Sequence, residues 1–240
     1  MFLNMLKAEK IKLHNSPIWL AFFIIPCLSA FMGTFNYLNN TSVLTKAWYS
    51  LWTQHTLFYC SFCFPALIGV YCAYECRLEH IQNNWNIILT MPVKKKFIYF
   101  SKLITIYKVV LVTQLLAGIL FYISGKLSGF SEPMPLRFIL LLILGSVGSL
   151  PIISAQLSLS LRIKSFSLPI GISIIGGILG LLSNAKGLGV FFPYSLFSLG
   201  MCASDPLNLE CSIPAFIISC IVFATIFSVI GIYIIGKEDD

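Results

Sequence analysis

Few side chains in this sequence have the type and spacing that catalysis needs. The histidines His14, His55 and His80 are far apart, and no HExxH pattern or paired carboxylates lie in an apolar run, so no catalytic or metal site is predicted. A glycine-rich loop ending in Lys-Ser/Thr is missing, and the chain is not expected to hydrolyse ATP by itself. Cys60 and Cys63 form a CxxC within the apolar run FYCSFCFP, where two small buried hydrophobes are the better interpretation.

The apolar runs also lack a site for a coupling ion. Ion-coupled carriers usually place Asp, Glu or His near the middle of the membrane, whereas these runs offer only Gln156, hydroxyl groups and Lys108 near one end. This argues against a secondary transporter and against a selective channel. Gln156 is a candidate for the translocation path, although an interhelical hydrogen bond is the more common role for such a residue. A transporter of this kind would need an external energy source.

The composition predicts an integral membrane protein. Of the 240 residues, 58% are hydrophobic and only 10% are charged, which is too apolar for one water-soluble core. The net charge of +7 is spread in short groups beside apolar runs, a pattern typical of membrane topology and not of nucleic-acid binding. Most cysteines lie in or beside apolar runs, so a secreted disulfide framework is not expected. Cys202 and Cys211 could pair or remain thiols.

The apolar runs predict an all-α fold of six membrane-spanning helices in a single domain, residues 1–240. Residues 1–16, which include Glu9, Lys10 and Lys12, predict a retained interfacial helix; a solvated tail would leave several apolar side chains in water. Residues 39–55 are polar enough for a loop. Residues 183–212 predict short re-entrant or interfacial helices on the outer face. The predicted spans are residues 17–38, 56–74, 104–124, 138–160, 166–182 and 213–235.

The distribution of Lys and Arg predicts that both termini are cytoplasmic. This orientation leaves only Lys46, Lys126, Arg137 and Lys186 on the outer side of the membrane. It also places residues 75–102, the longest polar interruption of the chain, in the cytoplasm. Apolar residues recur there at helical spacing, which predicts an amphipathic helix over residues 75–91 with one wet face and one face against a second surface.

Three stretches carry a resemblance to a known family. They are MLKAEKIKLHNSPIWLAFFIIP, ECRLEHIQNNWNIILTMPVKKKFIYFSKL and AQLSLSLRIKSFSLPIGISIIGGILG. Together with the order of the elements, they resemble the ABC-2 class of ATP-binding-cassette permeases, and within it the subunits of lantibiotic immunity and peptide-resistance exporters (the MutE/EpiE/MutG type). The resemblance extends over almost the whole chain.

The resemblance implies that residues 75–91 are the coupling helix that docks in a groove of the ATPase. Glu75 and Glu79 would be its acids and Trp85 its apolar anchor, with Leu89 on the same helix. Pro92 and Val93 would end the helix and redirect the chain into the third span. In the alternative interpretation, Trp85 marks the membrane interface and Lys94 to Lys96 hold lipid phosphates.

The resemblance also implies the partners. The chain would bind no cofactor directly and would use ATP through a separate ABC ATPase, present in two copies, beside a second permease subunit that is a copy or a paralogue. The implied location is the bacterial cytoplasmic membrane, and the implied substrate is a cationic antimicrobial peptide. Alternatives are export of another amphiphile, such as a drug or a lipid-linked molecule, an enzyme that acts on lipids, or a membrane scaffold that transports nothing.

Overall fold

The computed structural model describes residues 2–14, 16–81, 93–208 and 211–237, and all secondary structure in these ranges is helical. The all-α prediction is therefore confirmed. A first helix precedes the long ones, and two short helices lie between the last two long ones. The elements are α1 (Phe2–His14), α2 (Ile18–Asn39), α3 (Ala47–Phe58), the π-helix η1 (Tyr59–Cys63), α4 (Phe64–His80), α6 (Lys95–Leu127), α7 (Arg137–Arg162), α8 (Ser167–Ala185), the 3-10 helix η3 (Gly189–Phe191), α9 (Leu196–Gly200) and α10 (Ile213–Lys237).

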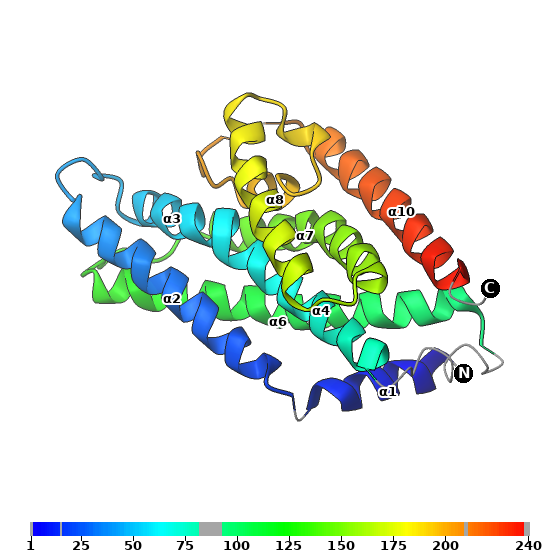
Figure 1. Cartoon of the computed structure of the whole chain (residues 1–240). Coiled ribbons are helices and arrows are strands. Elements are labelled where there is room, and N and C mark those ends of the chain that lie inside the picture. The colour runs from blue at the N-terminus through cyan, green and yellow to red at the C-terminus, as the bar shows by residue number, and fades with distance from the viewer. Residues whose placement is uncertain (1, 15, 82–92, 209–210, 238–240) are drawn as a thin grey trace.

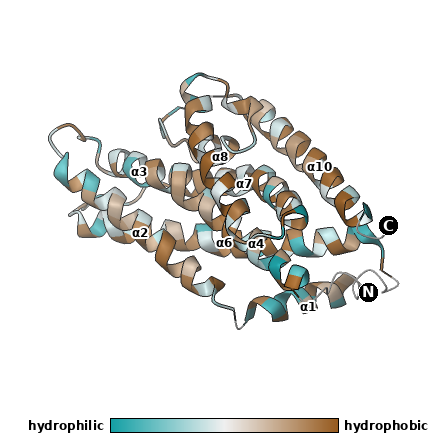
Figure 2. Ribbon diagram, viewed as in Figure 1, coloured by the Kyte–Doolittle hydropathy of each residue, from teal (hydrophilic) through white to brown (hydrophobic). Residues whose placement is uncertain are grey.

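Within the described residues, six helical segments are long and apolar enough to cross a membrane, as the sequence predicts. The second of them is the continuous run Ala47–His80, in which α3, η1 and α4 follow one another without a break. Large apolar side chains are exposed along α2 and α10, among them Phe23, Phe35 and Val229 (Figure 2). Exposed apolar surface of this extent fits helices that face lipid, and the chain is a multi-pass membrane protein.

The helix α7 forms the centre of the bundle. It packs against α10, α4, α6 and α9, and most of its residues are buried (Figure 1). The described ends of the chain, in α1 and α10, lie at the same end of the bundle, where α4 ends and α6 begins (Figure 1). This end of the molecule therefore brings together four segments that are far apart in the sequence.

Residues 47–55 differ from the prediction, because they are helical and do not form a loop. The polar side chains that suggested a loop are bonded to α2: Gln54 Oε1 accepts from Asn36 Nδ2 at 2.6 Å, and His55 Nε2 lies 3.0 Å from Thr34 Oγ1. Trp48 and Trp52 are buried in the same turns. A polar segment can remain helical inside a membrane protein when its polar groups find partners on a neighbouring helix.

The glycine-rich sequence of α8 packs within the chain. A Cβ atom at Gly177 would lie 2.4 Å from the Ser61 carbonyl oxygen in η1, and Ser173 Oγ donates to the Pro65 carbonyl oxygen at 2.5 Å. These contacts bring the backbones of α8 and the η1–α4 junction close together. The glycine face of α8 thus packs closely within one subunit.

The chain between α8 and α10 contains two short helices, η3 and α9. All five residues of α9 are buried, and the helix packs on α7. A Cβ at Gly148 of α7 would lie 2.4 Å from the Leu196 carbonyl oxygen, so glycine is required for this close approach. α9 is thus part of the bundle core, whereas only Gly189 of η3 is buried. The depth of both short helices in the membrane stays a prediction.

Candidate functional site

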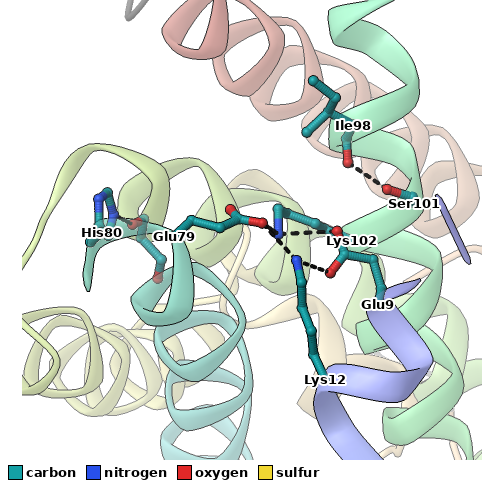
Figure 3. Close-up of polar contacts among 8 residues, drawn as sticks. Glu9, Lys12, Glu79, His80, Ile98, Ser101 and Lys102 are labelled. Carbon is teal, nitrogen blue, oxygen red and sulfur yellow. Dashed lines mark hydrogen bonds and ion pairs between the residues drawn. The ribbon is translucent and has the colours of Figure 1, made fainter. Parts of the chain in front are cut away.

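Charged side chains from three helices converge at the end of the bundle that holds the termini. α1 contributes Glu9 and Lys12, α4 contributes Glu79, and α6 contributes Lys102 (Figure 3). The term charge cluster is used below for these four residues. They come from positions up to 93 residues apart in the sequence, since they extend from Glu9 to Lys102.

Each carboxylate of the charge cluster contacts both lysines. Lys12 Nζ donates to Glu9 Oε2 at 2.7 Å and to Glu79 Oε1 at 2.9 Å. Lys102 Nζ also donates to Glu79 Oε1 and lies 3.3 Å from Glu9 Oε1. Two positive and two negative charges balance, so the cluster is neutral as a whole. Three of the four ion pairs join different helices and connect α1, α4 and α6; the fourth, between Glu9 and Lys12, lies within α1.

The charge cluster is buried. The relative exposure is 0% for Lys102, 2% for Glu79 and 5% for Glu9, whereas the side chain of Lys12 is 27% exposed. Burial alone would raise the pKa of Glu9, but the ammonium groups of Lys102 and Lys12 outweigh it and lower the pKa from 4.5 to about 2. Buried charges are tolerated only when they are paired, so loss of one member leaves an opposite charge without compensation.

Glu75 lies one turn before Glu79 and is completely buried. Among the described residues, no donor reaches either of its carboxyl oxygens. Burying a polar group without a hydrogen-bond partner costs stability. Glu75 neighbours Glu79 on α4 but takes no part in the ion pairs of the charge cluster.

The described residues on either side of the 82–92 segment are tied to other helices. Before the segment, Glu79 joins the charge cluster, and His80 Nε2 lies 2.9 Å from the Ser160 carbonyl oxygen of α7. After the segment, Lys95 Nζ donates to the Gly236 carbonyl oxygen of α10 at 3.2 Å. The described residues that flank the segment are therefore bonded to α1, α6, α7 and α10.

The family model of the ABC-2 family transporter protein matches residues 5–180, well over half of the chain. The chain belongs to the ABC-2 transporter family. It is therefore the membrane component of a transporter and is not the catalytic subunit, and family membership implies an ABC ATPase as its partner. A search of curated proteins found no match to the chain.

The matched region of this ABC-2 protein contains the whole charge cluster and the segment that the sequence analysis assigned to ATPase coupling. Residues 75–80 of that segment are the last turns of α4, and no separate helix begins at Glu75. Glu75 and Glu79 point into the protein. Val93 is half-buried against the main core. Trp85, Leu89 and Pro92 lie outside the described residues.

Lys102 is the member of the charge cluster that the sequence analysis did not assign to a site. Its position before an apolar run suggested only a cytoplasmic flank of the third span, but α6 begins at Lys95 and Lys102 is internal. A signal was present in α4: Glu75 and Glu79 continue a buried stripe that includes Ile68 and Cys72, at helical spacing. Acids on the apolar face of a helix require cations from a neighbouring element.

The remaining candidates occupy different places. Lys10 is exposed and lies outside the charge cluster. Gln156 is fully buried in α7, and its amide lies 2.6 Å from the Tyr194 hydroxyl. Cys60 is buried and Cys63 half-buried. In the part of the chain that the structure describes, no three His, Cys, Asp or Glu residues group as metal ligands would.

Proposed function

We propose that this ABC-2 protein is a permease subunit of an ATP-driven exporter, and that the 82–92 segment is where the ATPase acts. The observation that supports this is the anchoring on both sides of the segment, by Glu79 and His80 before it and by Lys95 after it. A docked ATPase that moves the segment would move four helices through these bonds. Such coupling requires that the segment is rigidly connected to the helices. Buried ion pairs provide this rigidity, because their side chains cannot exchange one partner for another without exposing a charge.

The proposal divides the predicted coupling residues into two groups. Because Glu75 and Glu79 are buried, it assigns them to transmission within the permease. Contact with the ATPase falls to the residues that follow them, with Trp85 as the apolar anchor and Leu89 beside it. Large aromatic anchors commonly dominate the binding energy of such interfaces. Pro92 and Val93 would then redirect the chain into α6.

Copurification of the ATPase with permease variants tests this division. Trp85→Ala should weaken ATPase binding by at least about 30-fold, the effect of losing a contact worth roughly 2 kcal/mol. Glu79→Gln should leave the ATPase bound while transport falls. Phe191→Ala is the control, because Phe191 is a large exposed aromatic residue of η3 with no part in the anchoring, and its loss should leave both quantities unchanged. Full ATPase binding and stimulation by Trp85→Ala would overturn the docking assignment.

The proposed substrate is a cationic antimicrobial peptide of the lantibiotic type, removed from the membrane to the outside. The support for it is the resemblance of three stretches to permeases of immunity and resistance systems. Deletion of the gene should sensitise cells to lantibiotics and leave their sensitivity to unrelated drugs unchanged. Unchanged killing across a lantibiotic panel would exclude this substrate and favour another amphiphile, such as a drug or a lipid-linked molecule.

The proposed assembly contains two ATPase copies and a second permease subunit, which is either a copy or a paralogue. It lies in the bacterial cytoplasmic membrane with both termini inside. Native mass spectrometry of the purified transporter gives the subunit count directly. Two reporters fused in turn to the C-terminus test the orientation. With the C-terminus inside the cell, a green fluorescent protein should fluoresce, and an alkaline phosphatase, which is active only outside the cytoplasm, should be inactive.

A further inference from the structure

A groove of about 230 Å³ lies between α1, the start of α2 and the middle of α6. These three helices meet on the lower side of the bundle in Figure 1. We propose that this groove binds an anionic phospholipid, with its phosphate between Lys10 and Lys108 and an acyl chain along the apolar floor. This site goes beyond the proposed ATPase coupling and is separate from the charge cluster.

One wall of the groove is a single stripe of α1. It consists of Leu6, Lys10, Leu13 and His14, which recur at the spacing of one helix face. Leu13 is 5% exposed, whereas Lys10 is exposed. The wall therefore has a buried apolar base and a cation near its rim, which is the arrangement that a lipid head group and acyl chain require.

The opposite wall is a matching stripe of α6. Thr105, Lys108, Val109 and Val112 have the i, i+3, i+4, i+7 spacing of one helix face. Lys108 is exposed and Val109 is largely buried. A lysine within an apolar helix usually extends its charged end toward the membrane surface. The second wall thus repeats the apolar base and the cation of the first.

The charge of the groove favours an anion. Glu9 and Lys12 of α1 are used by the charge cluster, and no carboxylate occurs among the described residues that line the groove. In the described part of the chain neither Lys10 nor Lys108 forms an ion pair, so both charges are open to an anion. The indole of Trp19 closes one end, and its Nε1 donates to the Leu13 carbonyl oxygen at 2.8 Å, which fixes the ring. Basic pockets between membrane helices on the cytoplasmic side are typical sites for anionic head groups.

The apolar floor distinguishes a lipid from other anions. A free phosphate would meet only exposed lysines, and exposed ion pairs contribute little binding energy. An anionic phospholipid also buries its acyl chain against Leu6, Leu13 and the two valines, Val109 and Val112. A cationic peptide would be repelled by Lys10 and Lys108.

Native mass spectrometry tests the proposal. The full-length protein in detergent is mixed with phosphatidylglycerol or phosphatidylcholine, and the lipid that stays bound after the detergent is removed is measured. Phosphatidylglycerol should be retained preferentially. Lys10→Gln and Lys108→Gln should each lower its apparent affinity about fivefold, the equivalent of roughly 1 kcal/mol per lysine. Lys108→Arg should keep most of the affinity. Lys7→Gln is the matched control, because Lys7 is exposed on the same helix but does not line the groove.

Three results would overturn the proposal. Equal retention of the two lipids would show that the groove does not distinguish an anionic head group from a zwitterionic one. An equal loss of affinity in Lys7→Gln would reduce the effect to general surface charge. Competition by glycerol phosphate at the same concentration as phosphatidylglycerol would show that the groove binds phosphate without using an acyl chain.

Discussion

Replacement of Lys102 by Met should open the end of the bundle where α1, α4 and α6 meet. The substitution keeps an unbranched side chain only one heavy atom shorter and removes one of the two positive charges of the charge cluster. Glu9 and Glu79 would then share Lys12 alone, which leaves one negative charge uncompensated in a site where the acids are at most 5% exposed. Breaking a buried pair from one side typically costs about 3–5 kcal/mol.

The pKa of Glu9 supports the direction of this effect. Burial raises it, but the charges of Lys102 and then Lys12 outweigh burial and lower the pKa from 4.5 to about 2. Both lysines contribute to this shift, so it does not measure Lys102 alone. From the lower end of the cost of breaking a buried pair, we expect Lys102→Met to reduce the free energy of local opening by about 3 kcal/mol.

Cys76 is a native reporter for this opening. It follows Glu75 in α4 and its relative exposure is 1%, so its thiol reacts with maleimide only when the packing opens. A loss of about 3 kcal/mol should raise the rate of Cys76 labelling on the order of a hundredfold. Cys211 lies outside the spanning helices, just before α10, and is partly exposed, so it serves as the internal reference in the same sample. Site-resolved mass spectrometry follows both thiols at once.

The double variant Glu79→Gln/Lys102→Met is the control. It removes one charge of each sign and leaves the ion pair between Glu9 and Lys12, so it should recover much of the protection of Cys76. Lys12→Met should have a smaller effect, because Lys12 is 27% exposed. The reasoning fails if Lys102→Met labels at the wild-type rate, or if the double variant labels as fast as the single one.

Three further predictions concern Glu9, α7 and the helix glycines. The pKa of Glu9 is lowered on folding, so the Glu9 carboxylate should stabilise the folded protein fully above about pH 5. This contribution should be lost as the pH falls from 4.5 to about 2. In detergent, the unfolding temperature of the wild type should therefore fall more steeply in this window than that of Glu9→Gln. Gln156→Leu should lower the stability by about 1 kcal/mol, and adding Tyr194→Phe should cost little more, since the two side chains share one hydrogen bond. Gly148→Ala should lower the unfolding temperature by several degrees because its Cβ would meet the Leu196 carbonyl oxygen, whereas Gly171→Ala, in α8 with open space around it, should not.

The sequence predicted the membrane class, the all-α fold and six spanning segments, because hydropathy summed over about 20 residues is a strong signal. The predicted loop was wrong for residues 47–55, which are helical. Their polar side chains were taken as a sign that the segment faces water. Gln54 and His55 instead bond to α2, and this depends on a contact between helices that no local pattern encodes.

The ion pairs of the charge cluster also depend on contacts between helices that the sequence pattern does not encode. The sequence analysis assigned Glu75 and Glu79 to the helix that contacts the ATPase, whereas both side chains are buried in the bundle. Their burial depends on Lys102 and on Lys12, which belong to other helices and approach only in the folded bundle. The direction in which a helical residue points could be worked out from the buried stripe of α4, whereas the identity of its partner required the tertiary structure.

The neutrality of the charge cluster also restricts how this part of the chain can evolve. A single substitution at Glu9, Glu79 or Lys102 leaves an unbalanced buried charge. Replacing one acid and one base together keeps the charges balanced. In related permeases we therefore expect these positions to vary together, either as charges of opposite sign or as apolar residues. An alignment in which an apolar residue replaces Lys102 while both acids persist would contradict this expectation.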